Sequence, residues 1–135
     1  IGETGVDEVA HANLEFKNGI KAKVSTAIRE SMKNNAVITG SEGMIELPDP
    51  WMPGRQGGPY HAKIIINKNG NEEVTDVKGP EHLFFFEGEL ASQCIAKEKT
   101  QPPHPAMTWE DTLGNLQALD TWREKVNYKL PQDEI

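Results

Sequence analysis

The sequence predicts an α+β domain in which helices pack on one face of an open, mainly antiparallel β-sheet. Two observations carry this prediction. The first two thirds of the chain alternate apolar and polar residues and are interrupted by turn residues, as in short strands. The last third places its apolar residues at helical spacing. Strands followed by helices are typical of α+β folds, and the 135 residues suit a single domain over 1–135.

A hairpin is predicted at the start of the chain. Residues 8–16 alternate, Asn18-Gly19 follows, and residues 20–28 alternate again. Asn-Gly is a strong hairpin signal because both residues accept a positive φ. The pattern gives the hairpin one polar face, formed by His11, Asn13, Glu15, Lys21, Lys23 and Ser25. Further strands are expected over 35–39, 44–47, 60–67 and 71–77.

Two helices are predicted after the strands, over 83–97 and from 109 to about 127. Thr108 is the expected N-cap of the second helix, with Asp111 in the third position of a capping box. We expect one side of this helix to line the core. Its apolar residues are Trp109, Leu113, Leu116, Leu119, Trp122 and Val126.

Composition excludes several classes of protein. The net charge of −7, with no stripe of Lys or Arg, argues against a nucleic-acid partner. No apolar run approaches the roughly 20 residues that span a bilayer, so no membrane association is expected. The lone Cys94 excludes an internal disulfide and suits a reducing, cytoplasmic compartment. Its place among apolar helix positions predicts a packing role.

The sequence has no self-contained catalytic or metal motif. It lacks a Gly-rich nucleotide loop, a P-loop, a His-Glu-x-x-His pair and paired cysteines. The four histidines share no ligand spacing. Asp7 and His11 have the spacing of an acid that orients a histidine, but Asp7 lies beside a turn, where a polar residue needs no special role. We therefore predict no catalytic or metal-binding residue in this chain.

The candidate binding residues are Trp51 and, more weakly, Arg29. Trp51 lies in a segment with prolines at 48, 50 and 53, which lack an N–H and cannot continue a strand. A tryptophan on such a stiff loop has no periodic partner, and this favours a ligand-facing role. Arg29 ends the second predicted strand, where it can contact a polar ligand or remain solvated.

The chain contains, in this order, the stretches GVDEVAHANLEFKNGIKAKVSTAIR, ITGSEGMIELPDPW and EGELASQCIAKEKTQPPHPAMTWEDTLGNLQALDTWR. Together they resemble the C-terminal half of the glucose–fructose oxidoreductase/inositol dehydrogenase (Gfo/Idh/MocA) family. The resemblance covers nearly the whole chain. The tail LPQDEI and the Trp-bearing proline loop are most similar to the branch of dimeric dihydrodiol dehydrogenases and xylose dehydrogenases.

The resemblance implies a division of labour. An N-terminal Rossmann domain, absent from this chain, would hold NAD or NADP and the catalytic lysine of a Glu-Lys-Pro motif, which does not occur here. The present domain would wall the substrate pocket, with Trp51 near the substrate, and would form a homodimer through its sheet face. The complete protein would exchange hydride with a secondary alcohol of a sugar, polyol or cyclic diol. The family's Asp-x-x-x-His pair lies upstream, so Asp7 and His11 match it by chance. We expect this chain alone to bind no cofactor and to be inactive.

A free-standing, non-catalytic sheet module that serves dimerisation or interaction is the alternative. The reading frame upstream of Ile1 discriminates the two hypotheses. A Gly-x-Gly-x-x-Gly motif followed by Glu-Lys-Pro supports the enzyme, and a start codon directly before Ile1 supports the module.

Overall fold

The computed structural model describes residues 1–54 and 58–129, so the tail LPQDEI lies outside the described residues. The α+β class is confirmed, and all strand pairs are antiparallel. The order of elements is β1 (Val9–Glu15), β2 (Lys21–Ala27), β3 (Asn35–Gly40), β4 (Gly43–Pro48), β5 (His61–Lys68), β6 (Asn71–Lys78), α1 (Leu83–Ala96) and α2 (Trp109–Lys125).

The strands form two sheets rather than the single sheet expected. One compact unit comprises residues 1–32 and 101–135 and contains the β1–β2 hairpin. The other comprises residues 33–100 and contains the four-stranded sheet β3-β4-β5-β6. Residues 28–34, between β2 and β3, form bends and irregular chain instead of a tight turn, so β2 does not pair with β3.

In the first unit, the predicted hairpin and its polar face are confirmed. His11 lies opposite Ser25 and Glu15 opposite Lys21, which keeps the polar side chains together. The capping box of α2 is also confirmed. The Thr108 hydroxyl accepts from the Asp111 N–H at 3.2 Å. The Asp111 carboxylate accepts from the Thr108 side chain and N–H, and these hydrogen bonds lower the pKa of Asp111.

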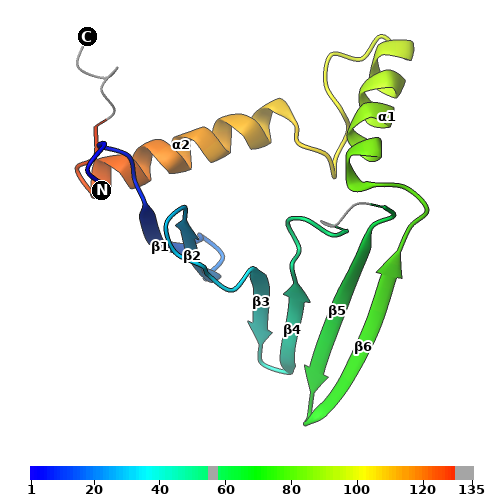
Figure 1. Ribbon diagram of the computed structural model, residues 1–135, viewed down its shortest axis with the longest axis horizontal. Helices are drawn as coiled ribbons and strands as arrows, with labels where there is room; N and C mark the ends of the chain where they lie inside the picture. The colour runs from blue at the N-terminus through cyan, green and yellow to red at the C-terminus, as the bar shows by residue number, and fades with distance from the viewer. Residues whose placement is uncertain (55–57, 130–135) are drawn as a thin grey trace. The chain divides into compact units, whose positions relative to one another are not determined.

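In the second unit, β3, β4, β5 and β6 follow one another in a four-stranded sheet (Figure 1). Their register sorts the residues into two faces. Asn69 and Gly70, both at positive φ, make the tight β5–β6 turn that fixes part of this register. The aliphatic face carries Ala36, Ile38, Ile45, Leu47, Ala62, Ile64, Ile66 and Val77, with the polar residues Lys68, Glu73 and Thr75 at its β5–β6 side. The mixed face carries Asn35, Val37, Glu46, His61, Ile65, Val74 and Asp76.

None of the described residues is buried, which contradicts the predicted core. Trp109 and Leu113 are each 59% exposed, and no residue of either helix is buried. The two antiparallel sheets and the two helices agree with the predicted α+β fold with an open sheet. No described helix is long and apolar enough to cross a membrane.

Candidate functional site

The Trp51 loop, residues 49–60, connects β4 to β5. Its described parts are 49–54 and 58–60. Pro48 is the last paired residue of β4, so strand pairing ends at the first of the prolines, as the sequence predicted. Trp51 is 70% exposed, although tryptophan usually packs against other groups. The loop thus presents a large aromatic ring to its surroundings, and the ligand-facing role of Trp51 stays a prediction.

The start of the loop is held by Asn34, the residue before β3. The Asp49 N–H donates to the Asn34 carbonyl at 2.8 Å, and the Asn34 amide donates to the Asp49 carboxylate. Asp49 has a φ of 48°, a left-handed conformation that few non-glycine residues adopt. The paired contacts from Asn34 stabilise this bend, which sets the direction in which Trp51 leaves the sheet.

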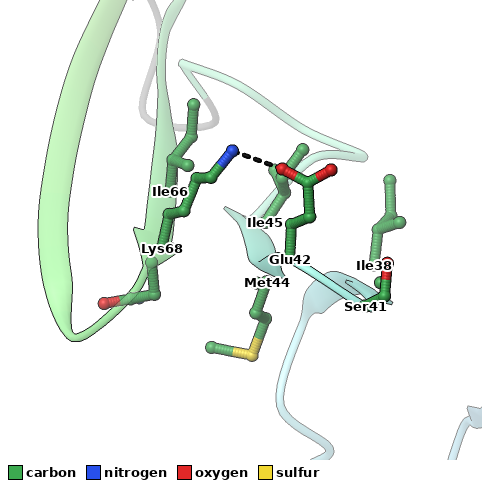
Figure 2. A pocket seen from close by; sticks show the side chains of 10 residues that line it. Ile38, Ser41, Glu42, Met44, Ile45, Ile66 and Lys68 are labelled. Carbon is green, nitrogen blue, oxygen red and sulfur yellow. Dashed lines mark hydrogen bonds and ion pairs between the residues drawn. The ribbon is translucent and has the colours of Figure 1, made fainter.

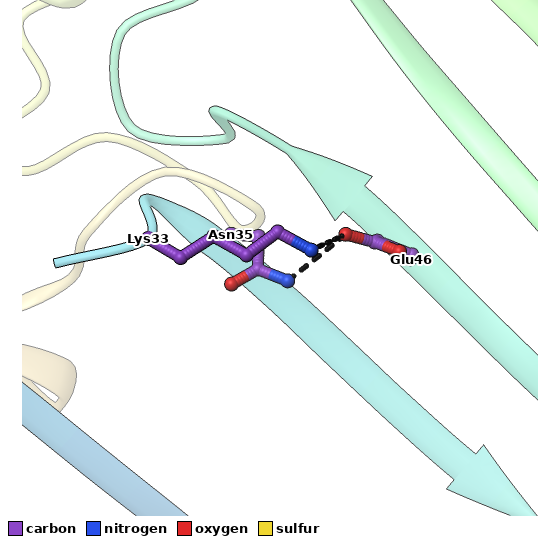
Figure 3. Close-up of polar contacts among 3 residues, drawn as sticks. All are labelled: Lys33, Asn35 and Glu46. Atoms are coloured by element: carbon purple, nitrogen blue, oxygen red, sulfur yellow. Dashed lines mark hydrogen bonds and ion pairs between the residues drawn. The ribbon is translucent and has the colours of Figure 1, made fainter.

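A second polar cluster surrounds Glu46 on β4, three residues before Asp49 in the sequence. The Glu46 carboxylate accepts from the Lys33 ammonium at 2.6 Å and from the Asn35 amide at 3.0 Å (Figure 3). The hydrogen bond from Lys33, and to a smaller extent that from Asn35, lowers the pKa of Glu46. The Glu46 side chain is 20% exposed, so the cluster is partly shielded from water. Lys33, Asn34 and Asn35 are consecutive, so one short segment holds both Glu46 and Asp49.

The end of the loop is held by Tyr60. Its N–H donates to the Glu81 carbonyl at 2.9 Å, and its ring meets Phe86 of α1 edge-on with the centroids 5.6 Å apart. Gly54, at a φ of 79°, lies against the backbone of Tyr60. Sequence reasoning missed Tyr60 and Asn34 as loop supports. Tyr60 directly follows Pro59, but Asn34 lies 14 residues before Pro48, so the local sequence does not reveal either contact.

Arg29 lies in the other unit, after β2. Its Nε donates to the Glu8 carboxylate at 3.2 Å, and its side chain is 71% exposed. Trp51 and Arg29 belong to different units. The geometry of Arg29 is that of an exposed ion pair, and its predicted ligand contact is a role that the structure leaves untested.

A cavity of ≈ 680 Å³ lies in the first unit, between the hairpin and α2. Asp7 and His11 both line it, together with apolar residues of α2. The His11 Nδ1 lies 2.8 Å from the Ser25 hydroxyl, its partner across the hairpin. Asp7 precedes β1, and the hydrogen-bond partner that the structure gives the His11 ring is Ser25 rather than Asp7. Among the described residues, no group of three His, Cys, Asp or Glu side chains is placed to hold a metal ion.

A smaller cavity of ≈ 320 Å³ lies in the second unit, at the β3–β4 turn (Figure 2). Ile38, Ile45 and Ile66, neighbours on the aliphatic face, supply much of its lining. Glu42 and Lys68 form an ion pair beside them. The isoleucines offer an apolar surface and no group that transfers protons, so this end of the sheet is suited to packing rather than chemistry.

The described residues do not fit a dinucleotide cofactor. Such cofactors place their pyrophosphate on free N–H groups at a helix N-terminus. In this structure His82 accepts from the Phe84 N–H at the start of α1, and Thr108 accepts from the Asp111 N–H at the start of α2. The first N–H of α2, from Trp109, donates to Gln101. Both helix starts are therefore occupied by the chain's own side chains.

Comparison with known proteins finds sequences similar to this chain. Its relatives include trans-1,2-dihydrobenzene-1,2-diol dehydrogenases. The protein from Mus musculus is 22% identical over 99% of this chain, and that from Sus scrofa is 23% identical over 98%. The Xenopus tropicalis protein is 29% identical over 84% of the chain. The chain is similar in sequence to the dihydrodiol dehydrogenases.

The expected resemblance to this branch of the Gfo/Idh/MocA family is confirmed. The chain spans 39% of the length of the mouse and pig dihydrodiol dehydrogenases and 34% of the frog one. The matched part is their C-terminal region. No family model matches the chain. No solved structure matches it either.

Proposed function

We propose that this chain is the substrate-binding and dimerisation part of an NAD(P)-dependent dehydrogenase that oxidises a secondary alcohol of a cyclic diol. The observation that carries the proposal is the match to dihydrodiol dehydrogenases along nearly the whole chain. The relatives' name points to a ring-shaped diol rather than to an open-chain sugar. Sugars and polyols, which the sequence resemblance also allowed, become the competing substrates of the test.

In this proposal, Trp51 forms an aromatic wall of the substrate pocket. An exposed indole on a loop held at both ends offers a flat apolar surface to the face of a cyclic diol. Asn34 and Tyr60 hold the loop, so the ring keeps its place when substrate binds. The nicotinamide cofactor supplies the hydride chemistry, and it would be bound by polypeptide outside this segment, because neither described helix start fits it.

A homodimer through the four-stranded sheet is part of the proposal. The aliphatic face places Ile38, Ile45 and Ile66 side by side across three strands, and Ile38 is 59% exposed. The mixed face instead pairs its charges internally, as Lys33 with Glu46 and His61 with Asp76. Permanent homodimer interfaces are rich in apolar residues, so the aliphatic face is the better candidate.

The catalytic proposal is tested by steady-state kinetics of the intact protein with benzene dihydrodiol and, for comparison, with open-chain polyols. We expect Trp51→Ala to lower kcat/KM for the cyclic diol by about ten- to a hundredfold, since an aromatic contact contributes about 1.5–3 kcal/mol. Trp109→Ala is the matched control, because Trp109 is also exposed but lies on α2. Equal activity of Trp51→Ala and wild type would remove the proposed wall. A preference for open-chain polyols would reject the cyclic substrate.

The dimer is tested by analytical ultracentrifugation of two variants of neighbouring residues. Ile38→Lys places a charge on the aliphatic face and is expected to shift the protein to monomer. Val37→Lys, which changes the opposite face of the same strand, is expected to remain dimeric. If Val37→Lys alone dissociates the protein, the dimer uses the mixed face. A monomeric wild type at tens of micromolar would reject the dimer altogether.

A further inference from the structure

Tyr60, the last residue of the Trp51 loop, makes four contacts, which reach the first part of the loop, the segment before α1, and α1 itself. Its backbone lies against Gly54, so a Cβ built on Gly54 would be 3.1 Å from the Tyr60 Cα. Its N–H donates to Glu81, and its carbonyl accepts from the Gly79 N–H at 3.2 Å. Its ring meets Phe86 edge-on. One residue therefore touches the Trp51 loop, the 79–81 segment and α1.

The ring of Tyr60 occupies the space that a side chain at position 79 would fill. A Cβ built on Gly79 would lie 2.0 Å from Cε1 and 2.6 Å from Cζ of Tyr60. These distances are far below van der Waals contact, so any side chain at this position would displace the ring. Gly79 does not have the positive φ that would itself require glycine. The absence of a side chain at Gly79 therefore serves the Tyr60 ring rather than the backbone.

We propose that Tyr60 and Gly79 are positioning residues for Trp51. The Tyr60 ring, lodged over Gly79 and against Phe86, fixes the end of the loop. Gly54 contacts Tyr60 and lies three residues after Trp51. The fixed position of Tyr60 therefore also restricts the position of Trp51. The inference rests on the proposed function, in which Trp51 walls the substrate pocket. It adds that substrate fit depends on Gly79, which lies 28 positions after Trp51 in the sequence.

The test uses the intact protein labelled with 5-fluorotryptophan and observed by ¹⁹F NMR, with the Trp51 resonance assigned from Trp51→Phe. We expect Gly79→Ala to shift or broaden the Trp51 resonance, because the added methyl group displaces the Tyr60 ring. The resonances of Trp109 and Trp122 should keep their positions. Gly88→Ala is the matched control. It adds the same methyl group on α1, where nothing lies within 4 Å, and it should leave the Trp51 resonance in place.

Kinetics of the same variants separate this inference from the proposed function. If both hold, Gly79→Ala lowers kcat/KM for the cyclic diol by about tenfold, since a small displacement of a binding surface is costly, and Gly88→Ala does not. A shifted Trp51 resonance with unchanged kcat/KM would support the positioning role and overturn the substrate role of Trp51. An unchanged Trp51 resonance in Gly79→Ala would overturn the positioning role whatever the activity.

Two substitutions of Tyr60 keep the inference testable if Gly79→Ala does not fold. Tyr60→Leu removes the ring that meets Phe86 and is expected to shift the Trp51 resonance. Tyr60→Phe keeps the ring and its place over Gly79, so the Trp51 resonance should stay where it is. Equal spectra of Tyr60→Leu and Tyr60→Phe would contradict the inference.

Discussion

The two ends of β4 are held in different ways. At Gly43 the chain reverses from β3 in a tight turn, and the approach of backbone to backbone decides the geometry. At Pro48 the chain leaves the sheet for the Trp51 loop, and side chains from Lys33 to Asn35 hold it. Both ends carry a Lys–Glu ion pair, but Glu42 is 77% exposed and Glu46 only 20%. The first end serves the sheet, whereas the second controls where an exposed aromatic ring lies.

The largest effect on stability is expected at the turn. An Ala Cβ at Gly43 would lie 2.2 Å from the Asn67 carbonyl oxygen, a backbone atom that cannot rotate away. We expect Gly43→Ala to lower the free energy of unfolding by about 3 kcal/mol, measured by urea denaturation of the intact protein. Gly40→Ala is the control, since its Cβ would meet no atom closer than 4.0 Å. Equal stability of the two variants would show that the sheet can shift to accept the methyl group.

A smaller effect on stability, coupled to substrate binding, is expected at the start of the loop. Asn34→Ala removes the amide that donates to Asp49 but keeps the backbone hydrogen bond. We expect a loss of about 1–2 kcal/mol in the free energy of unfolding and a raised KM for the cyclic diol. Asn18→Ala, in the β1–β2 turn, removes a similar contact with the Ile20 N–H and should leave KM unchanged. A raised KM in both variants would indicate a general loss of structure.

The smallest effect depends on pH and distinguishes the two ion pairs. Hydrogen bonds from Lys33 and Asn35 lower the pKa of Glu46 below its ordinary value of 4.5. The stabilisation is therefore complete above that ordinary pKa and is lost as the pH falls through the lowered pKa of the folded state. We expect Glu46→Gln to reduce Tm at pH 7 and to flatten the fall in Tm under acid conditions.

The control for this prediction is Glu42→Gln, followed by differential scanning calorimetry across the same pH range. Both members of the Glu42–Lys68 pair are mostly exposed, so breaking the pair by Glu42→Gln should leave Tm nearly unchanged. A larger change for Glu42→Gln than for Glu46→Gln would reverse the comparison between the two ends of β4.

The strands, their turns and both helices could be predicted from local patterns, because each depends on residues close together in the sequence. The Asn69-Gly70 turn and the Thr108–Asp111 capping box are examples. The gap between β2 and β3 was missed, since alternation predicts strands but not which strands pair. The exposure of Trp109 was missed because helical spacing shows which residues share a side, not whether another layer covers them.

The candidate site was predictable only in part. Trp51 was recognisable because prolines around it rule out a strand, and this is a local property. The proposed roles of Tyr60 and Gly79 depend on a contact between residues 19 positions apart. Gly79 lies in a short segment before a helix, where a glycine is common and does not indicate such a contact. The His82 cap of α1 was missed for a related reason: its ring accepts from the Phe84 N–H, although histidine is not among the preferred N-cap residues.

The alignment of Ile38, Ile45 and Ile66 across three strands constrains how this protein can change over time. An insertion of one residue within a strand would exchange its aliphatic and mixed sides, because side chains alternate along the strand. An insertion in the Trp51 loop leaves every strand in register and adds little entropy cost. Evolution, or an engineer, can therefore reshape the rim of the proposed pocket by altering loop length while the sheet beneath stays the same.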